Sequence, residues 1–410
     1  MGDNVELKTS RRGRLGISPN FVIMMTTLID MIGFGMVIPI LPFHPETASA
    51  GAFALGLLVG SFSLMQFIFY PLLGRLSDKV GRKPILLLSI FFSTVSFIVF
   101  ALANSFLVLL LSRITAGMAT EAAVAQAYIA DITSETDRAG GMGMVGAAHG
   151  AGFVIGPAIG GFLSIYGLLT LGFVAAALNG INFLFASLFL PESKHPIQMF
   201  KGSDDGYWRK LMKALTKPLI GAVFIILFLI TLAFSAIPVI LPLLGIAFFG
   251  FGEVEMSYFF MYIGVVQIVL QGVLIGRLTK RWGEENLIIL GSLLMMFGVF
   301  IMPLAPNLAA FLASITMFSS GFGILGTVLF SFISKRTAAD EQGIMLGVAQ
   351  SVGSIARIPG PLIGGFIAEL AGLSVSFFIS AFLLLVASGL GLKAFQPHRF
   401  RVPLGKGVVS

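Results

Sequence analysis

The stretch GRLSDKVGRK, Gly74 to Lys83, returns 202 residues later as GRLTKRWGEE, Gly276 to Glu285. Gly-Arg-Leu and the later glycine stand in register in the two copies. A second pair, GPAIGG from Gly156 and GPLIGG from Gly360, repeats at an offset of 204 residues. Duplication of this kind is typical of membrane proteins built from two related bundles, so the sequence predicts two halves of similar fold.

Composition places both halves in a membrane. Hydrophobic residues fill 57% of the 410 positions and charged residues only 11%, which is far from the composition of a soluble domain. Apolar stretches long enough to cross roughly 30 Å of hydrocarbon as helices recur throughout. The predicted spans are residues 21–42, 52–73, 84–103, 107–130, 141–165, 168–190, 218–241, 257–275, 286–304, 308–332, 343–369 and 373–394. We predict an all-α membrane protein with twelve transmembrane helices in two pseudo-symmetric six-helix bundles.

Basic residues indicate the orientation of these spans. Of 26 Lys and Arg residues, 24 precede the first span, follow an even-numbered span or end the chain, and such residues are held on the cytoplasmic side. We therefore expect a multi-pass protein of the cell inner (plasma) membrane with both termini cytoplasmic. We also expect a monomer. The net charge of +7 is then an orientation signal, and no nucleic-acid partner is expected. The predicted segments are a cytoplasmic tail (1–19), the first bundle (20–192), a cytoplasmic linker (193–217), the second bundle (218–395) and a cytoplasmic tail (396–410).

Asp30 is an acid inside the first span, within TTLIDMIGFGMVIPILP, residues 26–42. A mid-membrane carboxylate costs about 2.5–3.5 kcal/mol, so such residues face a bundle interior or a wet cavity. At roughly 1.5 Å per residue, Asp30 lies about 14 Å from the cytoplasmic edge, at a depth similar to that of His149. Arg113, entering from the outer side, reaches far enough to pair with Asp30 if the two spans are neighbours.

Glu121 is a second acid in the same half, eight residues after Arg113 with Gly117 midway, so the three are expected on one helical stripe. Two acids, one Arg and one His leave an excess acid whose protonation the surroundings can tune. We predict proton-coupling roles for Asp30, Arg113, Glu121 and His149, with Asp30 and Glu121 also binding substrate. An Asp30–Arg113 pair that only fixes packing stays open, as does a Glu121 satisfied by His149 or a carbonyl.

Arg357 is the second basic residue inside a span, beside Pro359 and Gly360. We assign Arg357 to substrate binding. Its guanidinium has two possible partners, an anionic group of the substrate or a cage of carbonyl groups.

Four motifs carry a family resemblance that covers nearly the whole chain. They are GRLSDKVGRKP after the second span, Arg113 with Gly117 in the fourth, GAAHGAGFVIGPAIGG in the fifth and LIDMIGFGMVIPILP in the first. The sequence resembles the major facilitator superfamily, and within it the twelve-span drug:proton antiporters that include tetracycline-type efflux pumps.

The resemblance implies roles for the motif residues. The loop would act as a gate that bridges the halves when the cytoplasmic side is closed, through Asp78 at a helix N-terminus and a charge network of Arg82 with Asp131. A solvated turn that only sets orientation is the alternative. In the fifth span, small residues let helices approach closely, and the family implies a helix that packs on the other half and limits leak. The gating residues are Gly74, Asp78, Gly81, Arg82 and Asp131, and the packing residues are Gly146, Gly150, Gly156, Pro157, Gly160 and Gly161.

The function predicted is proton-coupled antiport that exports lipophilic, multidrug-like or tetracycline-like small molecules by alternating access, with protons and the lipid bilayer as the other partners. A proton-coupled uptake symporter for a metabolite and a lipid flippase are the alternatives. We expect no enzyme activity, cofactor or metal, since the sequence has no cysteine, nucleophile elbow or phosphate-binding loop. Two G-x-G-x-x-G matches, from Gly141 and from Gly321, follow no soluble strand and are rejected as nucleotide sites.

Overall fold

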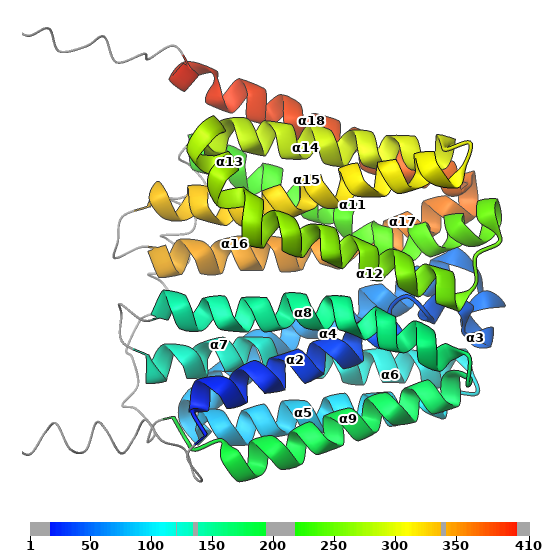
Figure 1. The fold of residues 1–410 in the computed structure, drawn as a ribbon, viewed down its shortest axis with the longest axis vertical. Helices are drawn as coiled ribbons and strands as arrows, with labels where there is room; N and C mark the ends of the chain where they lie inside the picture. Colours follow the sequence, from blue (N-terminus) through cyan, green and yellow to red (C-terminus); the bar gives the residue numbers. More distant parts are fainter. Residues whose placement is uncertain (1–16, 120, 134–137, 194–217, 338–341, 400–410) are drawn as a thin grey trace, which may run out of the picture. The chain divides into compact units, whose positions relative to one another are not determined.

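The protein is all-helical in the computed structural model, which describes residues 17–119, 121–133, 138–193, 218–337 and 342–399 (Figure 1). The longer helices are α2 (Pro19–Val37), α4 (Gly51–Val80), α5 (Arg82–Ala101), α6 (Phe106–Met118), α7 (Glu121–Ile132), α8 (Arg138–Ser164), α9 (Leu168–Phe189), α11 (Pro218–Phe249), α12 (Glu253–Val269), α13 (Ile275–Trp282), α14 (Glu284–Ile301), α15 (Leu308–Lys335), α16 (Gln342–Arg357), α17 (Pro359–Ala371) and α18 (Leu373–Arg399). Short segments are α3 (Pro45–Ala48), the 3-10 turns Leu41–Phe43 and Met302–Leu304, and a π-helical stretch at Leu270–Leu274.

Eleven helical segments in these ranges are long and apolar enough to cross a membrane. The remaining predicted span, 343–369, is carried by α16 and α17, which are separated at Ile358 just before Pro359. Proline removes a backbone donor and clashes with the preceding turn, so a break here is expected. The twelve-span, all-α prediction is confirmed.

The repeated loop motif turns the chain in the same way in both copies. Gly81 separates α4 from α5 at φ 112°, and Gly283 separates α13 from α14 at φ 74°. A positive φ strains residues with a side chain but not glycine. The register found between the two copies in the sequence therefore corresponds to a shared backbone turn.

Contacts divide the chain into two compact units. Of the described residues, those within 1–201, 235–268 and 357–377 form the first, and those within 202–234, 269–356 and 378–410 form the second. In the first, α8 packs on α2, α9 on α5 and α2, and α17 on α4. In the second, α14 packs on α15, where Gly298 lies so close to Phe318 that a Cβ would come 2.4 Å from its backbone nitrogen.

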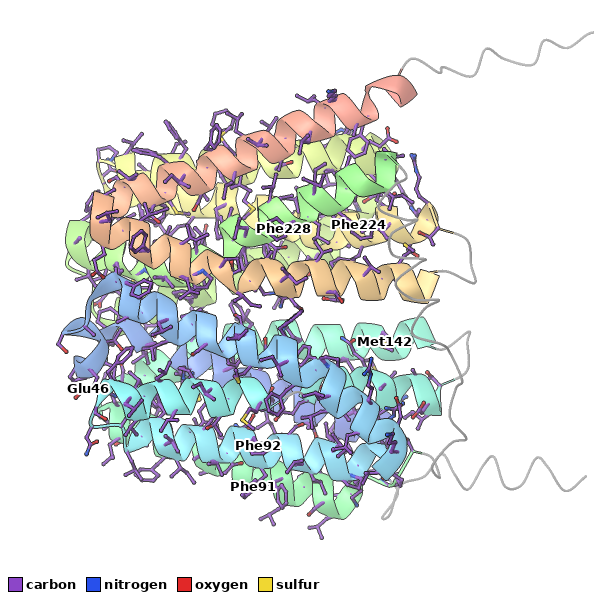
Figure 2. The ribbon with its side chains drawn as sticks, turned by 180° about the vertical axis from the view of Figure 1, so that it is seen from behind. Glu46, Phe91, Phe92, Met142, Phe224 and Phe228 are labelled. Carbon is purple, nitrogen blue, oxygen red and sulfur yellow. The ribbon has the colours of Figure 1, made fainter. Side chains whose placement is uncertain are left out.

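Exposed apolar side chains cover the outside of these helices (Figure 2). On α5, Phe91 is 51% exposed, whereas Ile90 beside it is fully buried. A helix that is apolar both inside and outside is typical of a membrane span. The exposed residues are therefore suited to contact lipid.

The boundaries expected for the two tails, the linker and the two bundles stay a prediction. Residues 1–16, 194–217 and 400–410 lie outside the described residues, so most of both tails and of the linker falls there. The first four basic residues used for orientation, Lys8, Arg11, Arg12 and Arg14, are among them.

Candidate functional site

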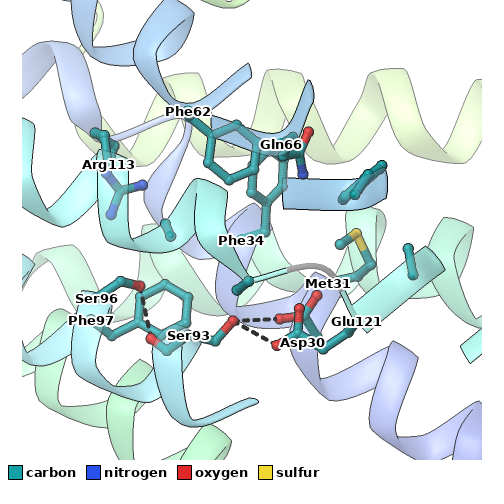
Figure 3. A pocket seen from close by; sticks show the side chains of 14 residues that line it. Asp30, Met31, Phe34, Phe62, Gln66, Ser93, Ser96, Phe97, Arg113 and Glu121 are labelled. Atoms are coloured by element: carbon teal, nitrogen blue, oxygen red, sulfur yellow. Dashed lines mark hydrogen bonds between the residues drawn. The ribbon is translucent and has the colours of Figure 1, made fainter. Parts of the chain in front are cut away.

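Two acids meet at one serine inside the first unit. Asp30 comes from the middle of α2, Ser93 from α5 and Glu121 from the first turn of α7. The Ser93 hydroxyl oxygen lies 3.1 Å from Asp30 Oδ1 and 2.8 Å from Glu121 Oε1 (Figure 3). All three side chains are buried, with Glu121 only 3% exposed. We call Asp30, Ser93 and Glu121 the carboxyl pair with its bridging serine.

The two contacts constrain the protons of this group. A serine hydroxyl has one hydrogen to donate, and an ionised carboxylate can only accept. The serine hydrogen makes a two-centre hydrogen bond to one carboxylate, and the other contact is a full hydrogen bond when the second carboxyl group carries a proton and donates to the serine oxygen. The geometry is therefore suited to two carboxyl groups that hold a single proton.

A break between α6 and α7 places Glu121 here. The sequence predicted Arg113, Gly117 and Glu121 on one continuous stripe, but α6 ends at Met118 and Ala119 is extended, with φ −74° and ψ 118°. Glu121 then begins a new helix. The predicted stripe is wrong, because the break turns Glu121 toward Asp30 and away from the direction of Arg113 (Figure 3).

Arg113 makes no ion pair among the described residues, so the expected Asp30–Arg113 pair is absent from this structure. Its Nε lies 3.2 Å from the Ser112 hydroxyl, and its guanidinium lies 5.4 Å from the centre of the Phe100 ring. Its Nη2 is buried without a hydrogen-bond partner. Contact with an aromatic face offsets part of the cost of a buried guanidinium.

One pocket joins these groups. It has about 440 Å³ of empty space, including the part that opens to solvent. Its walls contain Asp30, Glu121, Ser93 and Arg113 together with Phe34, Phe62, Phe97, Gln66 and Tyr70. Phe34 and Phe62 lie with their ring centres 5.2 Å apart. The walls thus combine aromatic rings with several polar and charged groups, and both kinds of group occur in small-molecule sites.

His149 and Arg357 are not among the residues that line the pocket. His149 is on α8 and exposed, and Arg357 ends α16. Arg357 interacts electrostatically with His149 and with Tyr70, which lines the pocket. His149 was one expected hydrogen-bond partner of Glu121, but the side chain in hydrogen-bond contact with Glu121 is Ser93. Among the described residues, no group of three His, Asp or Glu side chains is arranged to hold a metal.

The loop motif forms a charge network at the junction of α4 and α5. Arg82 Nη2 lies 2.6 Å from Asp78 Oδ1, and Arg82 Nε lies 3.0 Å from Asp131 Oδ2. Arg82 also donates to the Ser77 hydroxyl at 2.6 Å. The contact of Arg82 with Asp131 is the one that the resemblance implied. Its gating role stays a prediction.

Glu192 is a member of this network that the sequence reading missed. Its carboxylate accepts from the Arg82 amide at 2.7 Å and from the Lys83 amide at 3.2 Å, which caps α5. A Cβ on Gly81 would come 2.6 Å from Glu192 Oε2, whereas Gly74 has no atom within 4 Å of such a Cβ. Glu192 thus caps the N-terminus of α5, and the helix N-terminus contact expected of Asp78 stays a prediction.

The glycines of the fifth-span motif divide between different surroundings. A Cβ on Gly156 or Gly160 would come 2.6 Å from a backbone oxygen of α2, and a Cβ on Gly35 of α2 would come 2.9 Å from Pro157 Cδ. Gly161 faces Ser257 of α12, Gly150 has a single neighbour, Ile268, at 3.8 Å, and Gly146 has none within 4 Å. Most of the close packing is therefore within the first half of the sequence. Gly152, which also faces α2, was missed although it stands four residues before Gly156.

A model described as Major Facilitator Superfamily matches residues 23–361. The chain belongs to this superfamily. Its relatives include the class C tetracycline resistance protein of Escherichia coli, 31% identical over 83% of this chain and 87% of the relative. Multidrug resistance protein 2 of Bacillus subtilis (strain 168) is 28% identical over 90% of this chain and 94% of the relative. The resemblance read from the motifs is confirmed.

Solved structures share the fold at lower identity. The human organic anion transporter MFSD10 (TETRAN) is 24% identical with a TM-score of 0.68, and covers 91% of this chain and 98% of its own. The nucleoside transporter NupG is 14% identical with a TM-score of 0.74, and the match covers 93% of this chain and 100% of NupG. This major facilitator protein is a multi-pass membrane transporter and not an enzyme.

Proposed function

We propose that this transporter is a proton-coupled antiporter that exports lipophilic small molecules by alternating access. The observation that carries the proposal is the carboxyl pair with its bridging serine on the wall of the pocket. A proton held there leaves when a cation enters, because a nearby positive charge favours the ionised carboxylate. Substrate and proton then exclude one another, which is the requirement for exchange.

The pocket favours a lipophilic cation or a neutral molecule with a hydrogen-bond donor. Three phenylalanines, Phe34, Phe62 and Phe97, supply apolar contact, and the carboxyl pair supplies the acceptor. Arg113, with one unpartnered buried nitrogen, offers a donor to the same pocket. The relatives are tetracycline and multidrug resistance proteins, which supports export of such molecules.

The remaining predicted residues take supporting roles in this proposal. Arg82 with Asp78 and Asp131 closes the cytoplasmic side, and Gly156, Gly160 and Gly161 hold α8 against its neighbours to prevent leak. Arg357 and His149 contact the substrate or the proton path near Tyr70. The protein works as a monomer in the inner membrane with both termini in the cytoplasm.

Acid-loaded proteoliposomes test the proposal with tetraphenylphosphonium, a permanent lipophilic cation. With the membrane potential clamped by potassium and valinomycin, the native protein should accumulate this cation against its gradient, and Asp30→Asn and Glu121→Gln should not. Accumulation only when the outside is acidic would establish symport instead. Native-like accumulation by Asp30→Asn would remove Asp30 from the coupling mechanism.

A further inference from the structure

Five buried side chains on α2, α5 and α9 carry a polar atom without a hydrogen-bond partner in the described part of the chain. They are Thr26, Thr27, Ser89, Asn179 and Asn182, none more than 2% exposed. Hydroxyls on membrane helices commonly bond to a carbonyl of their own helix. Thr94 of α5 does so at 2.9 Å. Buried polar groups that lack a partner call for an explanation, and an ordered water is a common one.

Two of these side chains, Thr26 and Ser89, stand close to the carboxyl pair along their helices. Thr26 is one helical turn from Asp30, and Ser89 is one turn from Ser93. Residues four apart lie on the same helix face, so both hydroxyls share the faces that Ser93 joins to Asp30. From α9, Asn182 donates to the Thr26 carbonyl at 3.2 Å.

Thr26, Ser89 and Asn182 also lie at one depth. Each stands seven residues from an end of its helix, at Pro19, Arg82 and Phe189 respectively, which is about 10 Å at 1.5 Å per residue. These three ends lie on the same side of the first unit, since α5 and α9 run antiparallel (Figure 1). Thr26, Ser89 and Asn182 thus form a polar layer between the carboxyl pair and that side.

We propose that this layer binds water and conducts protons between the carboxyl pair and the side of the protein where α2 begins, apart from the substrate pocket. The proposal rests on the proton-coupled function above. A proton leaving Asp30 or Glu121 passes to the first water while another leaves the last, so the waters are unchanged. The three unpartnered atoms, one each on Thr26, Ser89 and Asn182, match the two to four partners that a buried water takes.

An apolar layer closes this path one turn further out. Val22, Ile85 and Ala186 stand four residues beyond Thr26, Ser89 and Asn182, and all three belong to one buried hydrophobic cluster. Ile23 and Leu86 of the same cluster fill the space beside them. Protons therefore cross only when this apolar layer opens, which prevents a leak around the substrate cycle.

Two transport modes in proteoliposomes test the path, with tetraphenylphosphonium as the probe. Exchange of labelled for unlabelled cation at equal pH needs no proton transfer, whereas accumulation driven by a pH gradient does. Thr26→Val, Ser89→Ala and Asn182→Leu should each slow accumulation driven by the pH gradient. The triple variant should slow it roughly tenfold, which corresponds to about 1.4 kcal/mol of added barrier. Exchange should keep its native rate, and Thr94→Val should keep both.

A polar substitution in the apolar layer should have the opposite effect, a faster passage of protons. Ile85→Thr places a hydroxyl one turn beyond Ser89, and the variant should dissipate a pH gradient without any cation present, as a pH-sensitive dye in the lumen would report. Equal slowing of both transport modes would assign the polar layer a packing role, and native rates in all variants would also overturn the path. Failure of the native protein to respond to a pH gradient, with exchange intact, would instead refute the proposed proton coupling.

Discussion

Gly156 is the position where a single methyl group should disturb both packing and coupling. A Cβ there would come 2.6 Å from the Ile32 carbonyl oxygen and 2.8 Å from Gly35 Cα. Both are backbone atoms of α2 and cannot rotate away, so Gly156→Ala must push α2 aside. Overpacking of this kind typically costs about 1–3 kcal/mol.

The displacement has a functional consequence because Asp30 is on the same helix, two residues before Ile32. Its 3.1 Å contact with Ser93 should lengthen as α2 moves. We expect Gly156→Ala to lower the thermal unfolding midpoint in detergent and to slow pH-driven accumulation of tetraphenylphosphonium.

Gly146 provides the matched control on the same helix. No atom lies within 4 Å of a Cβ placed there, and replacing glycine by alanine in a helix gains up to about 1 kcal/mol. Gly146→Ala should therefore be as stable as the native protein or more stable, with native transport. Equal midpoints for the two variants would refute the packing assigned to α8 and α2.

Three further changes test other parts of the account. Glu192→Gln should weaken the cap of α5 and slow transport more than it lowers the yield of folded protein, since two amides lose a charged acceptor; yield and activity falling together would leave Glu192 a purely structural role. Arg113→Ala should abolish pH-driven transport while Arg113→Lys keeps part of it, because lysine retains the charge but not the planar fork; full activity in Arg113→Ala would exclude a role in the pocket. The third concerns His44, whose Nδ1 accepts a hydrogen bond from the Glu46 amide. Burial lowers the pKa of His44 from its usual 6.5. The unfolded state then binds the proton more readily, so stability is lost as pH falls below about 6.5, and His44→Gln should show a smaller change in midpoint between pH 8 and pH 5 than the native protein.

The fold was predictable because hydrophobicity and charge placement are strong signals in a membrane chain. Span positions followed from apolar length, and the duplicated Gly81 and Gly283 pointed to equivalent turns, both found with positive φ. The break between α6 and α7 gave no such signal. The break falls at Ala119, and alanine is a strong helix former. Tertiary contacts decide whether a helix continues through such a residue.

The site was predictable in its ionisable residues and not in their pairing. Asp30 and Glu121 stand out because charges are rare in spans, and both line the pocket. Ser93 does not stand out, since α5 alone has serines at 89, 93 and 96. Arg113 was expected beside Asp30, but the partner of a long side chain depends on helix rotation, which depth along the membrane does not fix. Gly152 could have been found from its four-residue spacing to Gly156.

Proton release on substrate binding tests the central claim most directly. Tetraphenylphosphonium carries a permanent charge and no titratable proton, so any acidification on mixing it with detergent-solubilised protein in weak buffer comes from the protein. We predict release of about one proton per bound cation from the native protein, since the bridging serine suits a carboxyl pair with a single proton, and none from Glu121→Gln or Asp30→Asn. Binding without proton release by the native protein, or native release by both variants, would contradict the account.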